Sequence, residues 1–256
     1  MNPMRKKLKE GGVAYGLLVQ ELFTSGIAPM LAECGAEFVL FDMEHGRCDI
    51  SMAADMIAFC RGVEIVPMVR VPDAEVVPLS RVLDLGARGV MVPRVESRKQ
   101  MIEIVSRLKY PPEGKRGVAV GMAHDQYRPG GPGSFSEANQ DILVIALVET
   151  ATAFEHLDDI ISVPGVDVAW MGHYDLSVSM GIPAQFEHPK FLAAMDTLVD
   201  TCARHSVAPG FLPATPSEAL CWIRRGFRMI SLSSDIAIFM NAFRAFRRSV
   251  DENLSA

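Results

Sequence analysis

The 256-residue sequence has no paired-cysteine motif, no long apolar run and no excess of basic charge. Its five cysteines form no C-x-x-C pair and are odd in number, so neither a zinc site nor a disulfide framework is predicted. No apolar run reaches the roughly 18 residues of a membrane span. The basic N-terminal segment MNPMRKKLKEGG lacks the long apolar stretch of a signal peptide. These absences predict a soluble cytoplasmic protein with reduced thiols.

The charge balance argues against a nucleic-acid partner. The net charge is −6, and the basic residues are scattered apart from one cluster, Arg244, Arg247 and Arg248, which we interpret as a solvated helix face. Hydrophobic residues make up 49% of the chain and charged residues 22%, which supplies enough apolar material for a large core. We therefore expect neither nucleic acid nor a membrane as a partner.

Short apolar segments alternate with helical patterns along the whole chain. Strands are predicted near 13–20, 37–43, 64–70, 88–94, 142–149, 166–172, 207–212 and 227–233, and helices near 26–34, 50–61, 74–86, 97–109, 152–162, 189–205, 216–225 and 236–252. Continuous apolar strands followed by helices indicate parallel strands buried on both faces. Their even spacing, and the lack of a Gly-rich dinucleotide turn after the first strand, favour a (β/α)8 TIM barrel over a doubly wound sheet. We expect residues 1–256 to form a single α/β domain.

The stretch 110–140 interrupts this rhythm, because it is rich in Gly and Pro and too long for an ordinary connector. We place it on the rim where barrel active sites form. There it would serve as a lid or an oligomer contact rather than being disordered.

Several predicted strands end in ionisable residues. The segment FVLFDMEHGR carries Asp42, Glu44, His45 and Arg47, and other strands end in Arg70, Arg94, Glu149 and Asp175. Such groups oppose the apolar patterning and are tolerated mainly where they have chemistry to perform. The pattern predicts one polar site at one rim of the barrel.

Glu149 and Asp175 end neighbouring strands, so their carboxylates can face one cavity. Two adjacent carboxylates need a partner, and Mg²⁺ typically takes one or two carboxylates together with water and substrate oxygens. The alternative is two unrelated carboxylates that pair with Arg or Lys.

Arg70 suits the capture of a carboxylate or the stabilisation of an oxyanion, although a structural ion pair with Glu149 or Asp42 is equally compatible with its position. His45, close to aspartates, could act as a general base. Strict strand alternation would place it opposite Asp42, so its position alone is weak support for that role.

Six motifs appear in order, FDMEHG, PMVRVP, LDLGARGVMVPRV, YPPEGKRGV, ALVET and WMGHYDLSVSMG, and the similarity around them runs from about residue 12 to 240. Together they resemble the HpcH/HpaI family of class II pyruvate aldolases, which includes 4-hydroxy-2-oxoheptanedioate aldolase and 2-keto-3-deoxy sugar-acid aldolases. The resemblance implies a carbon–carbon lyase that cleaves a 4-hydroxy-2-oxo acid to pyruvate, or a related 2-keto acid, and an aldehyde. It also implies a divalent cofactor, Mg²⁺, Mn²⁺ or Co²⁺, and a homo-oligomer such as a trimer or hexamer.

The resemblance further implies residue roles. The metal ligands would be Glu149 and Asp175; the catalytic residues His45, Arg70, Asp42 and Asp84; and the substrate-binding residues Arg70, Gly172, His173, Tyr174, Asp175, Leu147 and Leu212. Gly172 and its neighbours would act mainly through backbone N–H groups. The family commonly has glutamine where this chain has Leu147, and proline before a small residue where it has His173 and Tyr174. These departures affect the expected substrate more than the reaction type.

Two other functions are compatible with the sequence. A CoA-ester lyase of the citramalyl- or malyl-CoA type would share the barrel and the paired carboxylates, but no basic track for a CoA tail is visible. A keto-acid-binding barrel without activity is disfavoured by the intact set of His45, Arg70, Glu149 and Asp175. No lysine lies inside a predicted strand, which argues against a Schiff-base aldolase.

Overall fold

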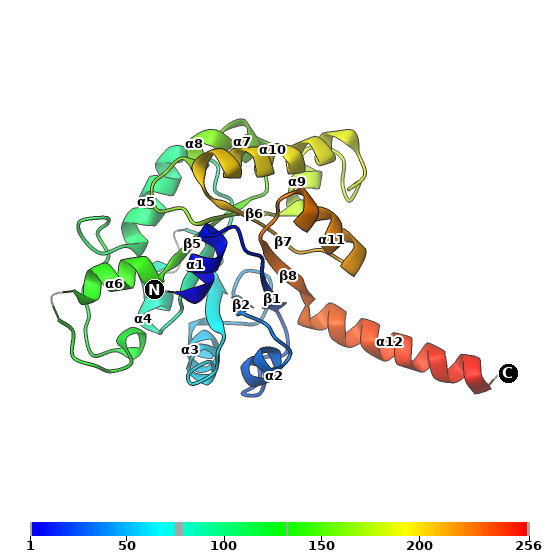
Figure 1. Ribbon diagram of the computed structural model, residues 1–256, viewed down its shortest axis with the longest axis horizontal. Helices are drawn as coiled ribbons and strands as arrows, with labels where there is room; N and C mark the ends of the chain where they lie inside the picture. The colour runs from blue at the N-terminus through cyan, green and yellow to red at the C-terminus, as the bar shows by residue number, and fades with distance from the viewer. Residues whose placement is uncertain (1, 75–78, 132, 255–256) are drawn as a thin grey trace.

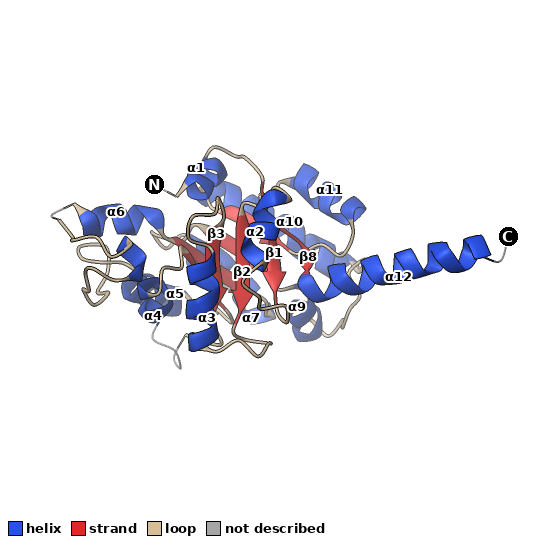
Figure 2. Cartoon of the chain, turned by 90° about the horizontal axis from the view of Figure 1, so that it is seen from below, coloured by secondary structure: helices blue, strands red, loops and turns tan. Residues whose placement is uncertain are grey.

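Eight parallel strands close into a barrel in the computed structural model, which describes residues 2–74, 79–131 and 133–254 (Figure 1). Each strand pairs with the next along the chain, and the last pairs back with the first. Helices surround the strands, which occupy the centre of the molecule (Figure 2). The predicted (β/α)8 barrel is confirmed.

The strands are β1 (Ala14–Val19), β2 (Phe38–Asp42), β3 (Val66–Arg70), β4 (Gly89–Val92), β5 (Leu143–Val148), β6 (Val168–Met171), β7 (Ala208–Phe211) and β8 (Met229–Ser234). The α-helices are α1 (Pro3–Lys9), α2 (Ile27–Glu33), α3 (Ile50–Phe59), α4 (Leu79–Asp84), α5 (Arg98–Leu108), α6 (Ser134–Asp141), α7 (Ala151–Glu155), α8 (Leu157–Ile161), α9 (His173–Ser179), α10 (Pro189–His205), α11 (Pro216–Arg225) and α12 (Asp235–Leu254), with a 3-10 turn η1 (Ala123–Asp125). No helix in the described ranges has the length and apolar character to cross a membrane.

Alternation along the strands separates two apolar clusters. On β2, Val39 and Phe41 belong to the outer cluster between barrel and helices, whereas Phe38 and Leu40 belong to the inner cluster that fills the barrel. Successive strand residues face opposite sides, so Asp42 continues the inward-facing set. The same alternation on other strands places polar residues on the inner side at the strand ends. These polar residues therefore meet at one end of the barrel.

Some helices differ from the sequence-based expectation. Helices α1, α6 and α9 were not predicted, and the helix expected at 152–162 is divided into α7 and α8 at His156. Of the helix expected at 74–86, the structure has Leu79–Asp84, and residues 75–78 lie outside the described residues.

The expectation that residues 110–140 lie on the active-site rim is wrong. The segment follows α5, and barrel helices run antiparallel to the strands, so the end of α5 lies at the amino ends of the strands. The Lys109 ammonium donates to the carbonyl oxygens of Asn139 and Ile142, and Arg88, just before β4, pairs with Asp141 of α6. The segment therefore lies at the opposite end of the barrel and cannot form a lid over its own site.

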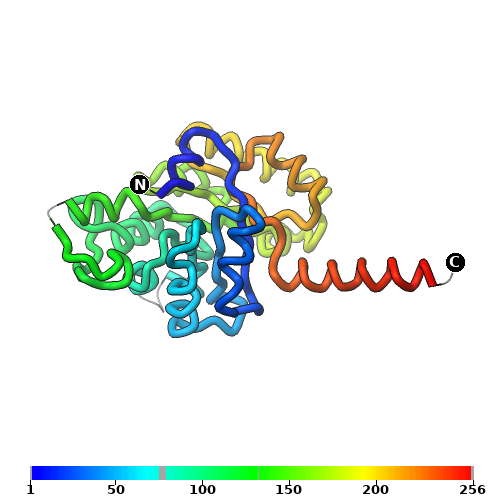
Figure 3. Tube along the Cα trace, turned by 60° about the horizontal axis from the view of Figure 1, so that its bottom comes forward, coloured from blue at the N-terminus to red at the C-terminus, as the bar shows by residue number. Residues whose placement is uncertain are grey.

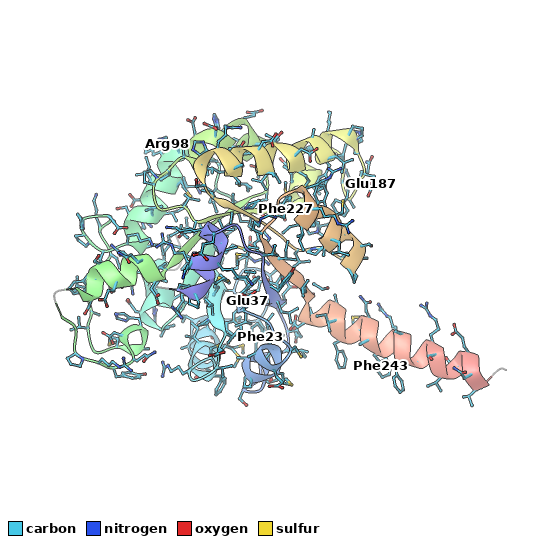
Figure 4. The ribbon with its side chains drawn as sticks, in the orientation of Figure 1. Phe23, Glu37, Arg98, Glu187, Phe227 and Phe243 are labelled. Atoms are coloured by element: carbon cyan, nitrogen blue, oxygen red, sulfur yellow. The ribbon has the colours of Figure 1, made fainter. Side chains whose placement is uncertain are left out.

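Helix α12 projects away from the barrel, as Figures 1 and 3 both show. Within the described part of the chain, Asp235 is its one buried residue. Phe243 lies on the projecting part (Figure 4), and 66% of its surface is exposed. The final helix thus carries apolar side chains that its own barrel does not cover.

Candidate active site

A cavity of about 480 Å³ opens at the carboxyl ends of the strands. Its lining includes polar residues from strand ends and apolar residues of the inner cluster: Leu18, Gln20, Leu40, His45, Arg70, Met91, Leu147, Glu149, Trp170, Gly172, His173, Tyr174, Asp175, Leu212, Ser233 and Asn241. The inward alternation of the strands places these groups together above an apolar floor.

Arg70 and Asp42 form the firmest contact of the site. They are register partners on β3 and β2. Arg70 Nε and Nη2 donate to the two carboxylate oxygens of Asp42 at 2.8 and 2.5 Å. Despite its burial, Asp42 keeps a lowered pKa because Arg70 and Gln20 donate hydrogen bonds to it. The ion pair with Asp42, one of the alternatives that the sequence left open, is present, and Arg70 also lines the cavity.

Glu44 brings a second carboxylate to Arg70. Its Oε2 lies 3.4 Å from Arg70 Nε and has no hydrogen-bond partner in the described structure. Burial raises the pKa of Glu44, against the attraction of Arg70. His45 follows at the mouth of the cavity: its ring is 52% exposed, and Nε2 lies 3.8 Å from Glu44 Oε1. The turn is held because Asp42 Oδ1 accepts the Glu44 and His45 backbone N–H groups.

Glu149 is buried, with 4% of its surface exposed. One carboxylate oxygen accepts the backbone N–H of Arg94 at 2.8 Å, and Arg94 has a left-handed backbone, φ 53°. Gly172 leaves room for the other oxygen, because a Cβ there would lie 2.6 Å from Glu149 Oε2. Burial, together with the negative charges of Glu44 and Asp175, raises the pKa of Glu149 to about 7.

The β6–α9 junction supplies the remaining predicted residues. Asp175, in the first turn of α9, is exposed and lines the cavity. The Gly172 N–H is bonded to the Val148 carbonyl oxygen, so a backbone role toward substrate falls to the residues that follow it. His173 packs edge-on against Phe211, and burial lowers its pKa to about 4. Tyr174 stacks beside His173 and is exposed at the mouth.

Leu147 and Leu212 also line the cavity. Leu147 faces the barrel interior two residues before Glu149, so it forms part of the floor directly below that carboxylate. Leu212 follows β7 and packs against the same inner cluster.

The structure does not bring Asp84 to this cavity. Asp84 ends α4, and its carboxylate accepts a hydrogen bond from the buried side chain of Arg116 at 2.6 Å. Arg116 lies in the 110–140 segment at the amino ends of the strands. Within one chain, Asp84 is therefore a structural partner of Arg116.

Two site residues were missed by the sequence analysis. Gln20 ends the inward set of β1 and donates to Asp42 Oδ2 at 2.9 Å, but it is neutral, and a search for charged strand ends passes over it. Glu44 was placed in the charged cluster and on the same face as Asp42, but no role was assigned to it. Its spacing of two residues from Asp42 was the available signal, because that spacing keeps both on one face.

Negative charge exceeds positive charge in this site. Asp42, Glu44, Glu149 and Asp175 bring carboxylates to the site, and Arg70 is the one Arg or Lys among the cavity-lining residues that the structure describes. No set of three or more His, Cys, Asp or Glu side chains in the described ranges could hold a metal ion by itself. Glu149 and Asp175 line one cavity and would supply two hard oxygen ligands, with the other positions left to water and substrate, which fits Mg²⁺ or Mn²⁺.

Comparison with known proteins identifies the family. The family model described as HpcH/HpaI aldolase/citrate lyase matches residues 21–242. A hydroxypyruvate/pyruvate aldolase from Roseobacter denitrificans is 32% identical over 94% of both chains. A 2-keto-3-deoxy-L-rhamnonate aldolase from Escherichia coli is 28% identical over 94% of this chain and 90% of its own.

A solved structure agrees with this result. The HpcH/HpaI aldolase from Desulfitobacterium hafniense superimposes with a TM-score of 0.91 at 30% identity, covering 97% of this chain and 96% of its own. The chain belongs to the HpcH/HpaI aldolase/citrate lyase family.

Proposed function

We propose that the protein is a metal-dependent class II aldolase that cleaves a 4-hydroxy-2-oxo acid to pyruvate, or a related 2-keto acid, and an aldehyde. Its family places it among the carbon–carbon lyases. The observation that carries the proposal is the buried carboxylate of Glu149, which shares one cavity with Asp175 and Arg70. The relatives named as aldolases favour this activity over a CoA-ester lyase.

Glu149 and Asp175 are the residues that would hold the cation. When bound, a divalent ion would act as a Lewis acid toward the keto oxygen and lower the cost of forming the enolate. The chain keeps Glu149 in place through the Arg94 N–H and the space at Gly172.

Arg70 supplies fixed positive charge where the enolate oxygen develops. Its two bonds to Asp42 orient the guanidinium before substrate arrives, so little reorganisation is needed during the reaction. Asp42 is thus a positioning residue, and Arg70 is the residue that faces substrate.

His45 is the proposed general base. It lies at the cavity mouth, where the aldehyde half of the substrate would enter, and takes the proton of the 4-hydroxyl group during cleavage. In the reverse reaction it returns that proton to the aldehyde oxygen. The backbone N–H of His45 donates to Asp42 Oδ1 at 3.4 Å, and the Glu44 carboxylate lies beside the His45 ring.

The test is a panel of aldehydes incubated with pyruvate or hydroxypyruvate and added Mg²⁺, Mn²⁺ or Co²⁺, with products identified by mass. The proposal expects new 4-hydroxy-2-oxo acids in at least one combination. Cleavage of citramalyl-CoA without any aldol product would instead assign the CoA-ester lyase activity. Binding of keto acid without turnover would assign a binding protein.

We also infer that the protein acts as a cytoplasmic homo-oligomer. The projecting part of α12 exposes Phe239, Phe243 and Phe246, the last with 76% of its surface accessible. An apolar stripe of this kind is typical of a surface that another subunit covers. Sedimentation at micromolar concentration should give an assembly of at least two chains, and a monomer would contradict the inference.

A further inference from the structure

The first residue of α12 is bonded to the loop that follows β1. Asp235 is 3% exposed, and its carboxylate accepts the backbone N–H groups of Gln20, Glu21 and Leu22 at 3.0, 2.9 and 2.7 Å. Its Oδ1 also accepts the N–H of Ile236. The bond to Ile236 belongs to the helix start, but the other three join α12 to a segment more than two hundred residues away in the sequence.

Gln20 connects Asp235 to the active site. Its backbone is fixed by Asp235, and its side-chain amide donates to Asp42 Oδ2, the oxygen that also accepts from Arg70 Nη2. The Gln20 carbonyl also lies against Gly46, where an added Cβ would approach it to 2.7 Å. Gly46 follows His45, so Gln20 bonds Asp42 and also lies beside the turn that carries His45.

We propose that Asp235 and Gln20 are positioning residues, which hold Asp42 and through it Arg70 in the orientation that the proposed aldol reaction requires. The geometry supports this role because Arg70 donates to both oxygens of Asp42, and the Gln20 amide donates to one of them, Oδ2. A carboxylate that accepts several backbone N–H groups is a strong, directional anchor. The expected effect on the cleavage rate rests on the proposed function, whereas the restraint of Arg70 by Gln20 and Asp42 does not.

Two substitutions test the link. Gln20→Met keeps the length of the side chain and removes its N–H donor. Asp235→Asn keeps the shape but turns one acceptor into a donor that faces other donors. The matched controls are Gln140→Met, on exposed α6 at the other end of the barrel, and Asp49→Asn, an exposed aspartate that caps α3.

The first readout is the ¹⁵N–¹H signal of Arg70 Nε in the full-length protein. Both variants should shift this signal and speed its exchange with water, because Asp42 loses its fixed position. Both controls should leave it unchanged. An unchanged Arg70 signal in Gln20→Met overturns the proposal, and this variant alone decides the matter if Asp235→Asn does not fold.

The second readout is catalysis. Gln20→Met should lower kcat for cleavage about 10-fold with Mn²⁺ affinity and melting temperature equal to those of Gln140→Met. In an Asp42→Ala background, Gln20→Met should not lower kcat any further, because the two residues act as one unit. Full additivity of the two losses would overturn the coupling. An inactive wild-type protein would instead overturn the proposed function, while the Arg70 signal would still decide the positioning role.

Discussion

At the scale of single residues, the site separates into a group that binds the keto acid and a group that moves a proton. Arg70 has 12% of its side chain exposed and is bonded at two nitrogens, whereas His45 is half exposed at the mouth. A residue held rigidly suits charge stabilisation, and one with access to the entering aldehyde suits proton transfer. The two roles should therefore separate by mutation.

We expect His45→Ala to lower aldol cleavage by about 10²–10⁴-fold, the loss typical of a missing general base, while oxalate binding stays near the wild-type value. Arg70→Ala should weaken oxalate binding and slow the exchange of pyruvate methyl protons with solvent. The two variants are compared by cleavage kinetics and by NMR measurement of proton exchange. Normal cleavage by His45→Ala would refute the assignment, as would normal exchange by Arg70→Ala.

Glu149 should also impose a pH dependence on the metal-free protein. Its pKa is raised from 4.5 to about 7, so ionisation is unfavourable in the folded state. The contribution of Glu149 to the free energy of unfolding is then most favourable below pH 4.5 and falls, by about 3 kcal/mol at most, as the pH rises through 7. Glu149→Gln removes this titration.

Denaturant unfolding of both metal-stripped proteins between pH 5 and 8 measures this effect. The free energy of unfolding of the wild type should fall relative to that of Glu149→Gln as pH rises. Parallel curves would mean that Glu149 titrates normally.

At the scale of elements, the strands were predictable and several connections were not. All eight strands begin and end within about two residues of their predicted bounds, because apolar runs buried on both faces are unambiguous. The ionisable residues at the predicted strand ends then indicated one polar site at one rim, and the structure has Asp42, Arg70 and Glu149 there. Helix α9 was missed because WMGHYDLSVSMG was interpreted as a strand end with ligands, without its helical turn.

The 110–140 segment was placed at the wrong end of the barrel for a different reason. Its sequence signals a long loop, but its position depends on the direction of the helix before it. The Lys109 and Arg88 contacts that reveal this position join residues about 30 and 50 apart. Such pairings cannot be deduced from local patterns.

The β6–α9 junction gives a prediction at this scale. Gly172→Ala places a methyl group 2.5 Å from Glu149 Cβ, so the carboxylate must move. We expect Mn²⁺ affinity to fall at least about 10-fold with the barrel intact, since displaced ligands and their supports typically cost that much. Gly117→Ala, at an exposed loop position with open space around its Cβ, is the control. Equal affinities by calorimetry would contradict the geometry.

At the scale of the whole molecule, α12 links the active site to the surface that we infer to be an interface. Its first residue anchors Gln20, and its projecting part carries apolar side chains at helical spacing, including Ile236, Phe239, Phe243 and Phe246. The apolar excess was visible in the sequence, but the departure of the helix from the barrel was not.

We expect Phe243→Glu with Phe246→Glu to shift the assembly toward monomer, because two charges would be buried in an apolar contact. Ala245→Glu places a carboxylate on the opposite face of the helix and should leave the assembly unchanged. Sedimentation velocity distinguishes the two. Identical assemblies for all three proteins would place the interface elsewhere.

The central claim is that Glu149 and Asp175 hold the cation on which cleavage depends. The most direct measurement is cleavage of a 4-hydroxy-2-oxo acid, identified by the panel above, with protein stripped of metal and then titrated with Mn²⁺. We expect no activity in the stripped protein and full recovery on titration, with Glu149→Ala and Asp175→Ala folded but inactive at the same metal concentration. Undiminished cleavage by thoroughly stripped wild-type protein would contradict the claim.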